Sequence, residues 1–300
     1  MPFRRVLIIA DIEGSSGCWS YAASSFLTDA WALACREMTR DVQAVVSALL
    51  RAGTREIIIK DFHRTGFNLL PELIDERARV DSGYARGPIP GMGHPGRAEA
   101  AMFLGLHAAS GTEGFLAHTL TSRLAAVRVD GRLLPELPLF ASLLAPYGIY
   151  PVFFSGCPVA CRQAASIIPG IATHAIDKTE GPDDFDHDKW RQGLARHAVA
   201  ALENRFTRLP ENSAPLDVCV RFRDGAAVAR TMARRWHLDR TGDTVFFEAA
   251  NLAELFNRLS RICYLRPAWL PLLPVGLPLY NLFGRAGLAW VRHRLKRIAP

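Results

Sequence analysis

The 300-residue sequence contains no Cys-x-x-Cys pair, no P-loop pattern, no internal repeat and no low-complexity segment. The missing cysteine pairs argue against the common cysteine-based zinc sites, and the missing P-loop argues against phosphate binding by that motif. Six cysteines are scattered along the chain, and we expect Cys157 and Cys161, one helical turn apart, to be buried thiols rather than zinc ligands. Free thiols are typical of a reducing compartment, so we expect the protein in the cytoplasm.

Acidic residues are absent after Glu254, although the formal net charge of the chain is +7. The rest of the chain is close to balanced, which argues against a nucleic-acid-binding surface. Arg4 and Arg5 lead directly into a short strand instead of a long apolar segment, so we expect no signal peptide. The cations that gather near the C-terminus are Arg285, Arg292, Arg294, Lys296 and Arg297.

Strands and helices alternate along the first half of the chain, which predicts the α/β class, with a mainly parallel sheet and helices on both faces. We divide the sequence into a core (1–180), a smaller C-terminal α+β portion of the same unit (181–265) and an apolar-basic tail (266–300). A hairpin is expected over Leu124–Leu134, around Asp130-Gly131. The expected strands of the core are Val6–Ala10, Glu56–Asp61, Ala101–Leu106, Tyr150–Ser155 and Ala172–Ile176, and a long helix is expected over 189–208.

Side chains that bind metals follow three of the predicted strands. Asp11 and Glu13 come directly after the first strand, His63 follows the second and His107 follows the third. In α/β sheets, metals and ligands gather outside the carboxyl ends of the strands, so these side chains are expected to lie together. Glu136 is the natural further carboxylate. A dinuclear zinc site requires such oxygen and imidazole ligands, which predicts a metallohydrolase.

Each residue also has a plainer interpretation. Two acids after a strand are often helix or loop caps, and a single histidine is often a hydrogen-bonded structural residue. Only the five together favour a metal site over these alternatives. His118, on a loop that can return to the same rim, could move a proton or steady an oxyanion. Asp61 either orients a ligand histidine or caps its own loop.

The segments that carry these residues resemble the DppA-type zinc D-aminopeptidases over roughly residues 4–265. The resemblance implies that Asp11, Glu13, His63, His107 and Glu136 hold two zinc ions, that Asp11 bridges them and that His118 is the catalytic histidine. It implies an α/β subunit in a ring-shaped decamer that cleaves an N-terminal, often D-, residue from a short peptide. The segments are 11–17, 61–63, 103–108, 117–119 and 131–137, and 79–83 resembles a further one.

Two segments depart from the family pattern. Cys157-Pro158 stands where family members tend to carry acidic residues, and residues 179–187 replace a basic, Ser/Ala-rich stretch. Either change could alter the substrate pocket or the subunit contacts. A zinc amidohydrolase or esterase acting on another small substrate is therefore an alternative. A membrane-associated or scaffold protein with a vestigial site is a third hypothesis, which retention of the whole ligand set disfavours.

The tail is apolar over Ala268–Phe283 and basic over Trp290–Arg297. The apolar part is too short for an ordinary membrane-spanning helix, and three prolines are expected to break it. We expect it to pack on a neighbouring subunit of a homo-oligomer. The alternative is peripheral contact with a membrane, with aromatic and leucine side chains inward and arginines on anionic headgroups.

Overall fold

The computed structural model describes residues 3–179, 181–203 and 215–298. Its first sheet has six strands in the order β3-β2-β1-β4-β7-β8, and every adjacent pair is parallel. This confirms the predicted α/β class with a mainly parallel sheet. The strands are β1 (Arg5–Ala10), β2 (Glu56–Asp61), β3 (Ala78–Asp81), β4 (Ala100–Leu106), β7 (Tyr150–Gly156) and β8 (Ala172–Ala175).

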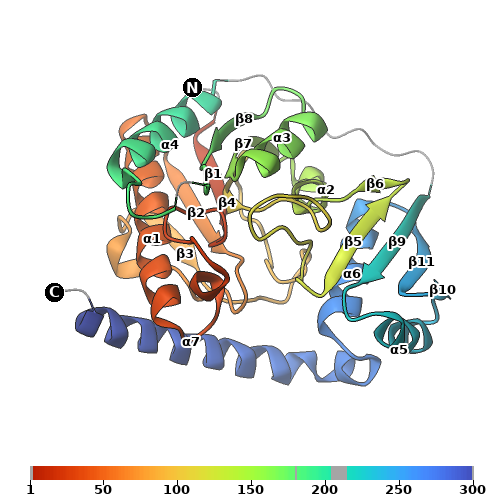
Figure 1. The fold of residues 1–300 in the computed structure, drawn as a ribbon. Coiled ribbons are helices and arrows are strands. Elements are labelled where there is room, and N and C mark those ends of the chain that lie inside the picture. Colours follow the sequence, from red (N-terminus) through yellow and green to blue (C-terminus); the bar gives the residue numbers. More distant parts are fainter. Residues whose placement is uncertain (1–2, 180, 204–214, 299–300) are drawn as a thin grey trace.

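Helices cover both faces of this sheet (Figure 1). Successive side chains of a strand point to opposite faces, so Val6 and Ile8 pack in one core while Leu7 and Ile9 pack in the other. The first core is completed by α1 (Asp29–Arg51), α4 (His187–Ala201) and α7 (Leu273–Ile298), and the second by α2 (Glu136–Leu144) and α3 (Pro158–Ile167). Strands buried on both faces explain the continuous apolar runs in the sequence.

The second sheet is antiparallel, in the order β10-β11-β9-β5-β6. Asp130 and Gly131 both have positive φ, which confirms the predicted hairpin turn between β5 and β6. Because β5 pairs with β9, this sheet takes strands from both sides of residue 180. Its elements are β5 (Leu124–Val129), β6 (Arg132–Leu133), β9 (Leu216–Phe222), β10 (Asp239–Thr241) and β11 (Thr244–Ala249), with helices α5 (Ala226–Trp236) and α6 (Leu252–Tyr264).

Two helices differ from the sequence predictions. The long helix expected over 189–208 is α4, which ends at Ala201, and residues 204–208 lie outside the described part of the chain. The tail forms a 3-10 turn that contains Pro271 and then one continuous helix, α7, so the expectation that prolines break the tail was wrong for Pro274 and Pro278. Pro274 lies in the first turn, where no intrahelical N–H bond is needed, and Pro278 lies one turn further on. Short 3-10 turns occur at Tyr21–Ser24, Pro71–Leu73, Ala145–Tyr147 and Pro267–Leu272.

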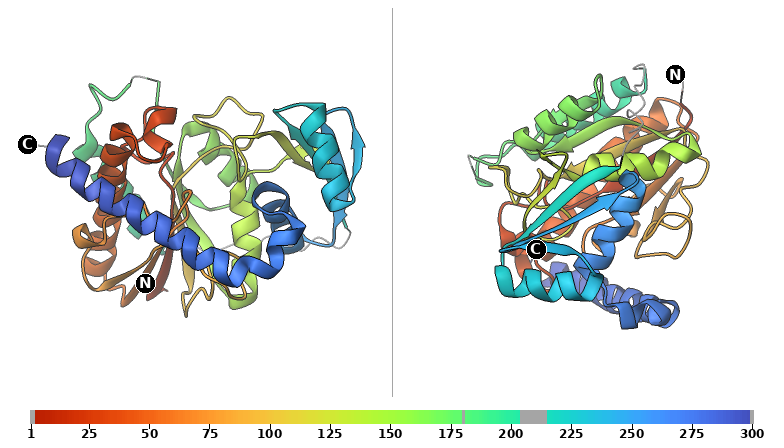
Figure 2. Two further views of the ribbon diagram at one scale, coloured as in Figure 1. Left: turned by 90° about the horizontal axis from the view of Figure 1, so that it is seen from below. Right: turned by 90° about the vertical axis from the view of Figure 1, so that its right-hand side faces the viewer.

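Helix α7 crosses the molecule from the second sheet to α1 (Figure 2). One side of it packs on its own chain, and the contact with a neighbouring subunit stays a prediction. The Trp290 and Trp31 rings stack at 6.0 Å, and Arg292 pairs with Glu72. Within the described residues, no single helix is long and apolar enough to cross a membrane. A bent pair, α6 with Pro267–Ile298, meets that criterion together, at an angle of 98°.

Candidate metal centre

The carboxyl ends of β1, β2 and β4 are level with one another. Ala10 pairs with Asp61 on one side and with Leu104 on the other, so the residues that follow these positions emerge at one edge. The Asp11 backbone N–H donates to the Leu104 carbonyl at 2.8 Å, which continues the sheet bonding by one residue. Asp11, His63 and His107 therefore meet at this edge, as the sequence predicted.

The Asp11 carboxylate lies between two histidines. Its Oδ1 is 3.1 Å from Nδ1 of His63, and its Oδ2 is 3.6 Å from Nε2 of His107. Glu13 Oε2 also lies 2.9 Å from His63 Nδ1, and Glu136 Oε1 lies 3.5 Å from His107 Nε2. The five predicted ligand residues are buried and adjacent, and Asp11 lies between His63 and His107.

The potential ligand atoms at this edge form two groups. Asp11, Glu13 and His63 form one group, and in each group the ligand atoms lie within 4.8 Å of one another. The other group consists of His107, His118 and Glu136. The geometry therefore adds His118 to the residues that could touch a metal. The rings of His107 and His118 stack with centroids 3.7 Å apart.

Main-chain carbonyls fix the tautomers of the three histidines. His63 Nε2 lies 3.0 Å from the Ser24 carbonyl, His107 Nδ1 lies 3.2 Å from the Ala108 carbonyl, and His118 Nδ1 lies 2.8 Å from the Leu116 carbonyl. A carbonyl only accepts, so each of these nitrogens carries the hydrogen. The other nitrogen of each neutral ring then presents a lone pair, and those of His63 and His107 face the carboxylates. This is the usual arrangement of metal-binding histidines.

Burial and charge set the pKa values of the cluster. Burial and the neighbouring Glu13 charge raise the pKa of Asp11 well above its usual range. Burial also acts to raise the pKa of Glu13, but His63 outweighs it and holds that pKa well below normal. Burial raises the pKa of Glu136 and lowers those of His107 and His118. Burial acts to lower the pKa of His63, but the Glu13 and Asp11 carboxylates outweigh it and raise that pKa well above normal. A divalent cation would replace this proton and meet a strong donor set of three buried carboxylates and imidazole nitrogens.

One buried carboxylate oxygen of the cluster lacks a hydrogen-bond donor in the part of the chain that the structure describes. Glu13 Oε2 accepts no hydrogen bond within the described residues, although it is close to His63. Buried carboxylate oxygens are normally hydrogen-bonded or bound to a metal. The unsatisfied oxygen and the two lone pairs beside the carboxylates fit nitrogen- and oxygen-coordinated metal ions.

One loop, residues 116–120, positions both Glu136 and His118. Glu136 is the first residue of α2, where the helix dipole favours a carboxylate, and it accepts a hydrogen bond from the Leu120 N–H at 2.7 Å. Leu116 and Leu120 flank His118 and both have positive φ, which is uncommon for leucine. The loop is therefore held in a strained conformation that turns His118 back over His107.

Asp61 caps its loop and is not one of the clustered ligands. Its carboxylate accepts hydrogen bonds from both backbone and side-chain N–H groups of Asn68, and from the Leu69 N–H at 3.0 Å. It also accepts a longer bond of 3.3 Å from the His63 N–H. Asp61 thus positions the segment that carries His63, which favours the loop-cap interpretation. The contribution of Asn68 was not predicted from the sequence.

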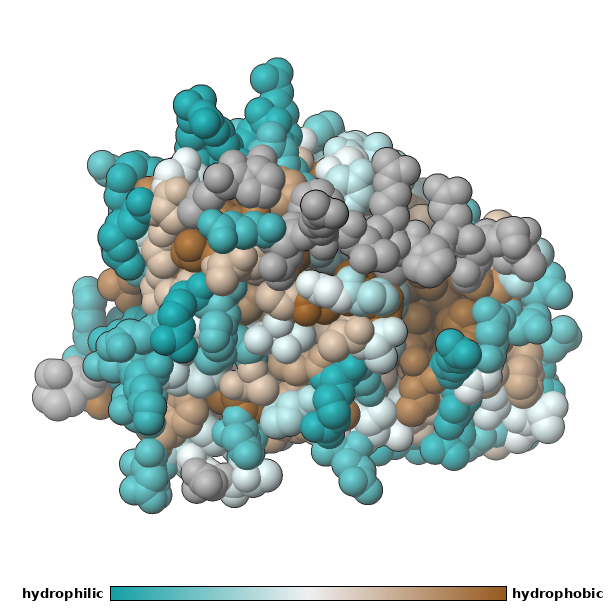
Figure 3. Space-filling model, turned by 90° about the horizontal axis from the view of Figure 1, so that it is seen from above, coloured by the Kyte–Doolittle hydropathy of each residue, from teal (hydrophilic) through white to brown (hydrophobic). Residues whose placement is uncertain are grey.

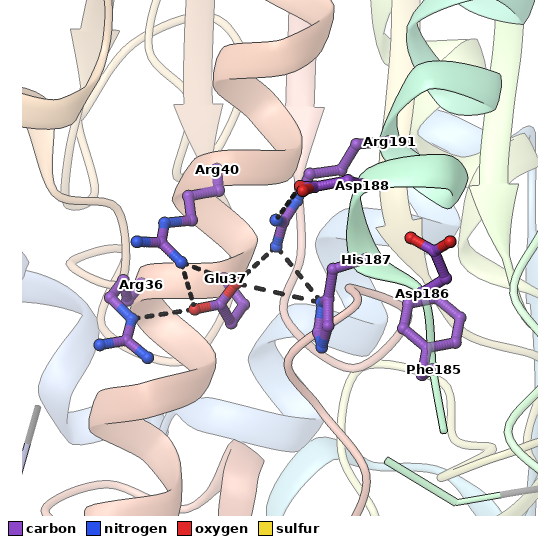
Figure 4. Close-up of a pocket in the computed structure, with 8 residues that line it drawn as sticks. All are labelled: Arg36, Glu37, Arg40, Phe185, Asp186, His187, Asp188 and Arg191. Atoms are coloured by element: carbon purple, nitrogen blue, oxygen red, sulfur yellow. Dashed lines mark hydrogen bonds and ion pairs between the residues drawn. The ribbon is translucent and has the colours of Figure 1, made fainter. Parts of the chain in front are cut away.

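A second polar cluster, also unpredicted, anchors the loop that follows Glu13. The Ser16 N–H and hydroxyl both donate to Asp41 at 2.7 Å, and Arg191 Nε donates to Asp41 at 2.9 Å. Arg191 also pairs with Glu37, beside His187 (Figure 4). His187, at the end of the divergent segment 179–187, contacts Ser16 Oγ at 3.2 Å, while residue 180 lies outside the described part. This cluster borders a pocket of about 510 Å³.

Gly105 allows the ends of β1 and β4 to approach each other closely. It has φ of +76°, and a Cβ there would lie 2.3 Å from the Asp11 carbonyl oxygen. Gly131 has a similar φ of +78°, with nothing within 4 Å of the corresponding position. Comparing substitutions at the two glycines therefore distinguishes the cost of a positive φ from the cost of a steric clash with the backbone.

We expect Gly105→Ala to lower the free energy of unfolding by about 3 kcal/mol or more, since the methyl group collides with backbone. Gly131→Ala should cost only about 1 kcal/mol, from the positive φ alone. Urea unfolding of the two metal-free variants measures the difference. Equal costs would show that Gly105 is required only for its backbone angle.

Fold and site together define an α/β protein with a buried cluster suited to one or two divalent metals. A family model described as D-aminopeptidase matches residues 4–260. The chain therefore belongs to the D-aminopeptidase family.

Two relatives show how far the likeness extends. A D-aminopeptidase of Bacillus subtilis (strain 168) is 25% identical over 142 residues, 47% of this chain and 52% of the relative, so the match spans about half of that protein. A solved structure, described as the Zn-dependent D-aminopeptidase DppA from Bacillus subtilis, a self-compartmentalizing protease, has a TM-score of 0.75 at 20% identity. It covers 87% of this chain and 97% of the other, and it shows that the fold is shared.

Proposed function

We propose that this protein is a zinc-dependent aminopeptidase that removes N-terminal residues, including D-residues, from short peptides. Family membership supports the reaction class, and the relative of known structure is described as Zn-dependent. The observation that carries the proposal is the convergence of three buried carboxylates on the ring nitrogens of His63 and His107 that face away from their carbonyl partners. This arrangement has no evident use in folding alone, because it leaves Glu13 Oε2 without a hydrogen bond.

The proposed ligands divide between two ions. Glu13 and His63 would hold one, His107 and Glu136 the other, and Asp11 would contact both with its two oxygens. When bound, zinc ions supply Lewis acidity to a carbonyl group and to water. The buried carboxylates balance the charge of the ions, and the surrounding apolar core keeps bulk water away from the site.

His118 is proposed as the catalytic histidine. Its Nδ1–H is engaged by the Leu116 carbonyl, so its Nε2 holds the free lone pair. Burial and the adjacent His107 lower its pKa, which keeps the ring neutral near pH 7. A neutral imidazole beside the reacting carbonyl can accept a proton at Nε2 and return it to the leaving amine.

We propose a homo-oligomer as the working form, because the relative of known structure is described as self-compartmentalizing. The decameric ring implied by the family resemblance is the specific form to test, by light scattering of the full chain. We also propose that 1–180 and 181–265 act as one catalytic unit, with 266–300 as a separate tail. The pairing of β5 with β9 supports this unit.

A second candidate keeps the metals and changes the bond, to another small amide or an ester. Cys157 supports it, because this residue departs from the family pattern and lies beside the loop that carries His118. A side chain at Gly114 of that loop would meet Cys157 Sγ at 3.3 Å. The substrate pocket can therefore differ while the ligand set is retained.

A panel of D- and L-aminoacyl dipeptides, aminoacyl amides and esters tests these proposals on zinc-loaded protein. Aminopeptidase activity predicts release of the N-terminal residue from dipeptides. Loss of cleavage when the N-terminus is acetylated would show that the free amine is recognised. Cleavage of amides or esters alone favours the second candidate. Metal binding without cleavage of any of these substrates would favour a vestigial site and contradict both.

A further inference from the structure

The outer side of the tail carries an apolar stripe, defined here as Leu272, Val275, Leu279 and Leu282. Their spacing of three and four residues places them on one side of a helix. Each is between 60% and 65% exposed. The surrounding segment 267–284 contains no charged residue, and Trp269 and Phe283 beside the stripe are about half exposed. Continuous exposed apolar surface of this kind marks an interaction site.

The stripe faces outward because the opposite side of α7 is held against the body. A Cβ at Gly284 would lie 2.3 Å from Phe67, and a Cβ at Gly287 would lie 2.3 Å from Phe26, so α7 lies very close to both rings. Asn281 exchanges two hydrogen bonds with the Tyr84 backbone, at 2.9 and 2.8 Å. The helix cannot turn to bury its stripe without breaking these contacts.

Cations border the stripe at both ends. Arg266 and Arg285 flank the uncharged segment, and Lys296 and Arg297 end the helix. Among the described residues, Arg285, Lys296 and Arg297 form no ion pair, whereas Arg292 and Arg294 are occupied by acids of the body. The face on the other side of the molecule is different, because hydrophilic side chains project along much of its rim, with apolar atoms in the hollows between (Figure 3).

We propose that α7 docks on the surface of an anionic lipid bilayer, with the stripe in the interface and the free cations on the headgroups. A helix with an apolar side, bordering aromatic residues and cationic ends suits the membrane interface. A two-fold contact between copies fits less well. It would bring the cations of one tail against those of the other, and no acid follows Glu254 to balance them.

Docking would bring the candidate metal centre close to the lipid. The Tyr280 hydroxyl donates to the Arg64 carbonyl at 3.2 Å, next to His63. The Tyr264 hydroxyl donates to the carbonyl of Leu120, whose N–H binds Glu136. Tyr280 of the tail and Tyr264 at the end of α6 therefore contact the two loops that position His63 and Glu136. The docking proposal itself rests on the exposed surface and holds whether or not the site is active.

Sedimentation of the full chain with vesicles tests the proposal. We expect binding to vesicles of phosphatidylcholine mixed with phosphatidylglycerol at low salt, weaker binding to phosphatidylcholine alone and release at high salt. Replacing Lys296 and Arg297 with glutamine should weaken binding about fivefold for each cation. Absence of binding to the anionic vesicles at low salt would overturn the proposal.

The double variant Leu279→Glu with Leu282→Glu tests the stripe, and we expect it to lose at least about tenfold in vesicle affinity. Phe246→Glu is the matched control, since Phe246 is 40% exposed on the second sheet, and it should bind as the parent does. Circular dichroism confirms that each variant is folded. Unchanged vesicle binding of the double variant, or a change in its oligomeric mass by light scattering, would contradict membrane docking and, in the second case, indicate a contact between copies.

Discussion

Replacing Asp11 with alanine is expected to remove most of the bound zinc and to lower peptide hydrolysis by about a hundredfold or more. Its two carboxylate oxygens face His63 and His107, so one substitution takes a donor from both proposed ions. The remaining carboxylates would still repel one another once the bridge is gone. Elemental analysis of protein purified without chelator should give about two divalent ions per chain for the parent.

Asp41→Asn provides a matched control for the loss of Asp11. Asp41 is also a buried carboxylate, but it binds Ser16 and Arg191 and lies outside the two ligand groups. This variant is expected to lose stability while keeping its metal. If Asp11→Ala retained two ions per chain, the assignment of Asp11 as a bridge would be wrong, whatever happened to activity.

The second large effect is expected for His118→Ala, which should lower the rate of hydrolysis by about 10²- to 10⁴-fold while both ions stay bound. The expected loss reflects removal of the Nε2 lone pair that accepts the proton. The measurement pairs kcat with metal content, because His118 also lies within reach of His107 and Glu136. A fall in metal content would make it a ligand instead.

His94→Ala is the control for this variant, since His94 is an exposed loop histidine that belongs to neither ligand group. It should change neither activity nor metal content. Unchanged hydrolysis in His118→Ala, with the control also unchanged, would rule out the catalytic assignment. The proposed metal ligands would be unaffected by that result.

The central sheet and its site edge could be predicted from local patterns. Apolar runs such as Val6–Ala10 end at polar residues, and parallel strands place those ends side by side. The second sheet could not be assembled in this way. The β5 hairpin pairs with β9, more than eighty residues further along the chain, and nothing in the hairpin itself identifies that partner.

In the site, too, the ligand residues could be predicted from the sequence, but the contacts that hold them could not. The residue types of Asp11, Glu13, His63, His107 and Glu136, together with their places after predicted strands and a hairpin, are enough to indicate a cluster. The groups that hold them give no such signal, because Arg191 reaches Asp41 across 150 residues and the tautomers depend on backbone carbonyls. Such contacts depend on how distant segments pack, which periodicity does not encode.

The carbonyl partners of the histidines have a consequence for how metal preference can change over time. Each ring is oriented by the peptide chain itself, at Ser24, Ala108 or Leu116, so no point mutation deletes the orienting group. Selection for a different ion can therefore act most directly through the carboxylates. The imidazole scaffold stays constant, and the acids become the adjustable part of the site.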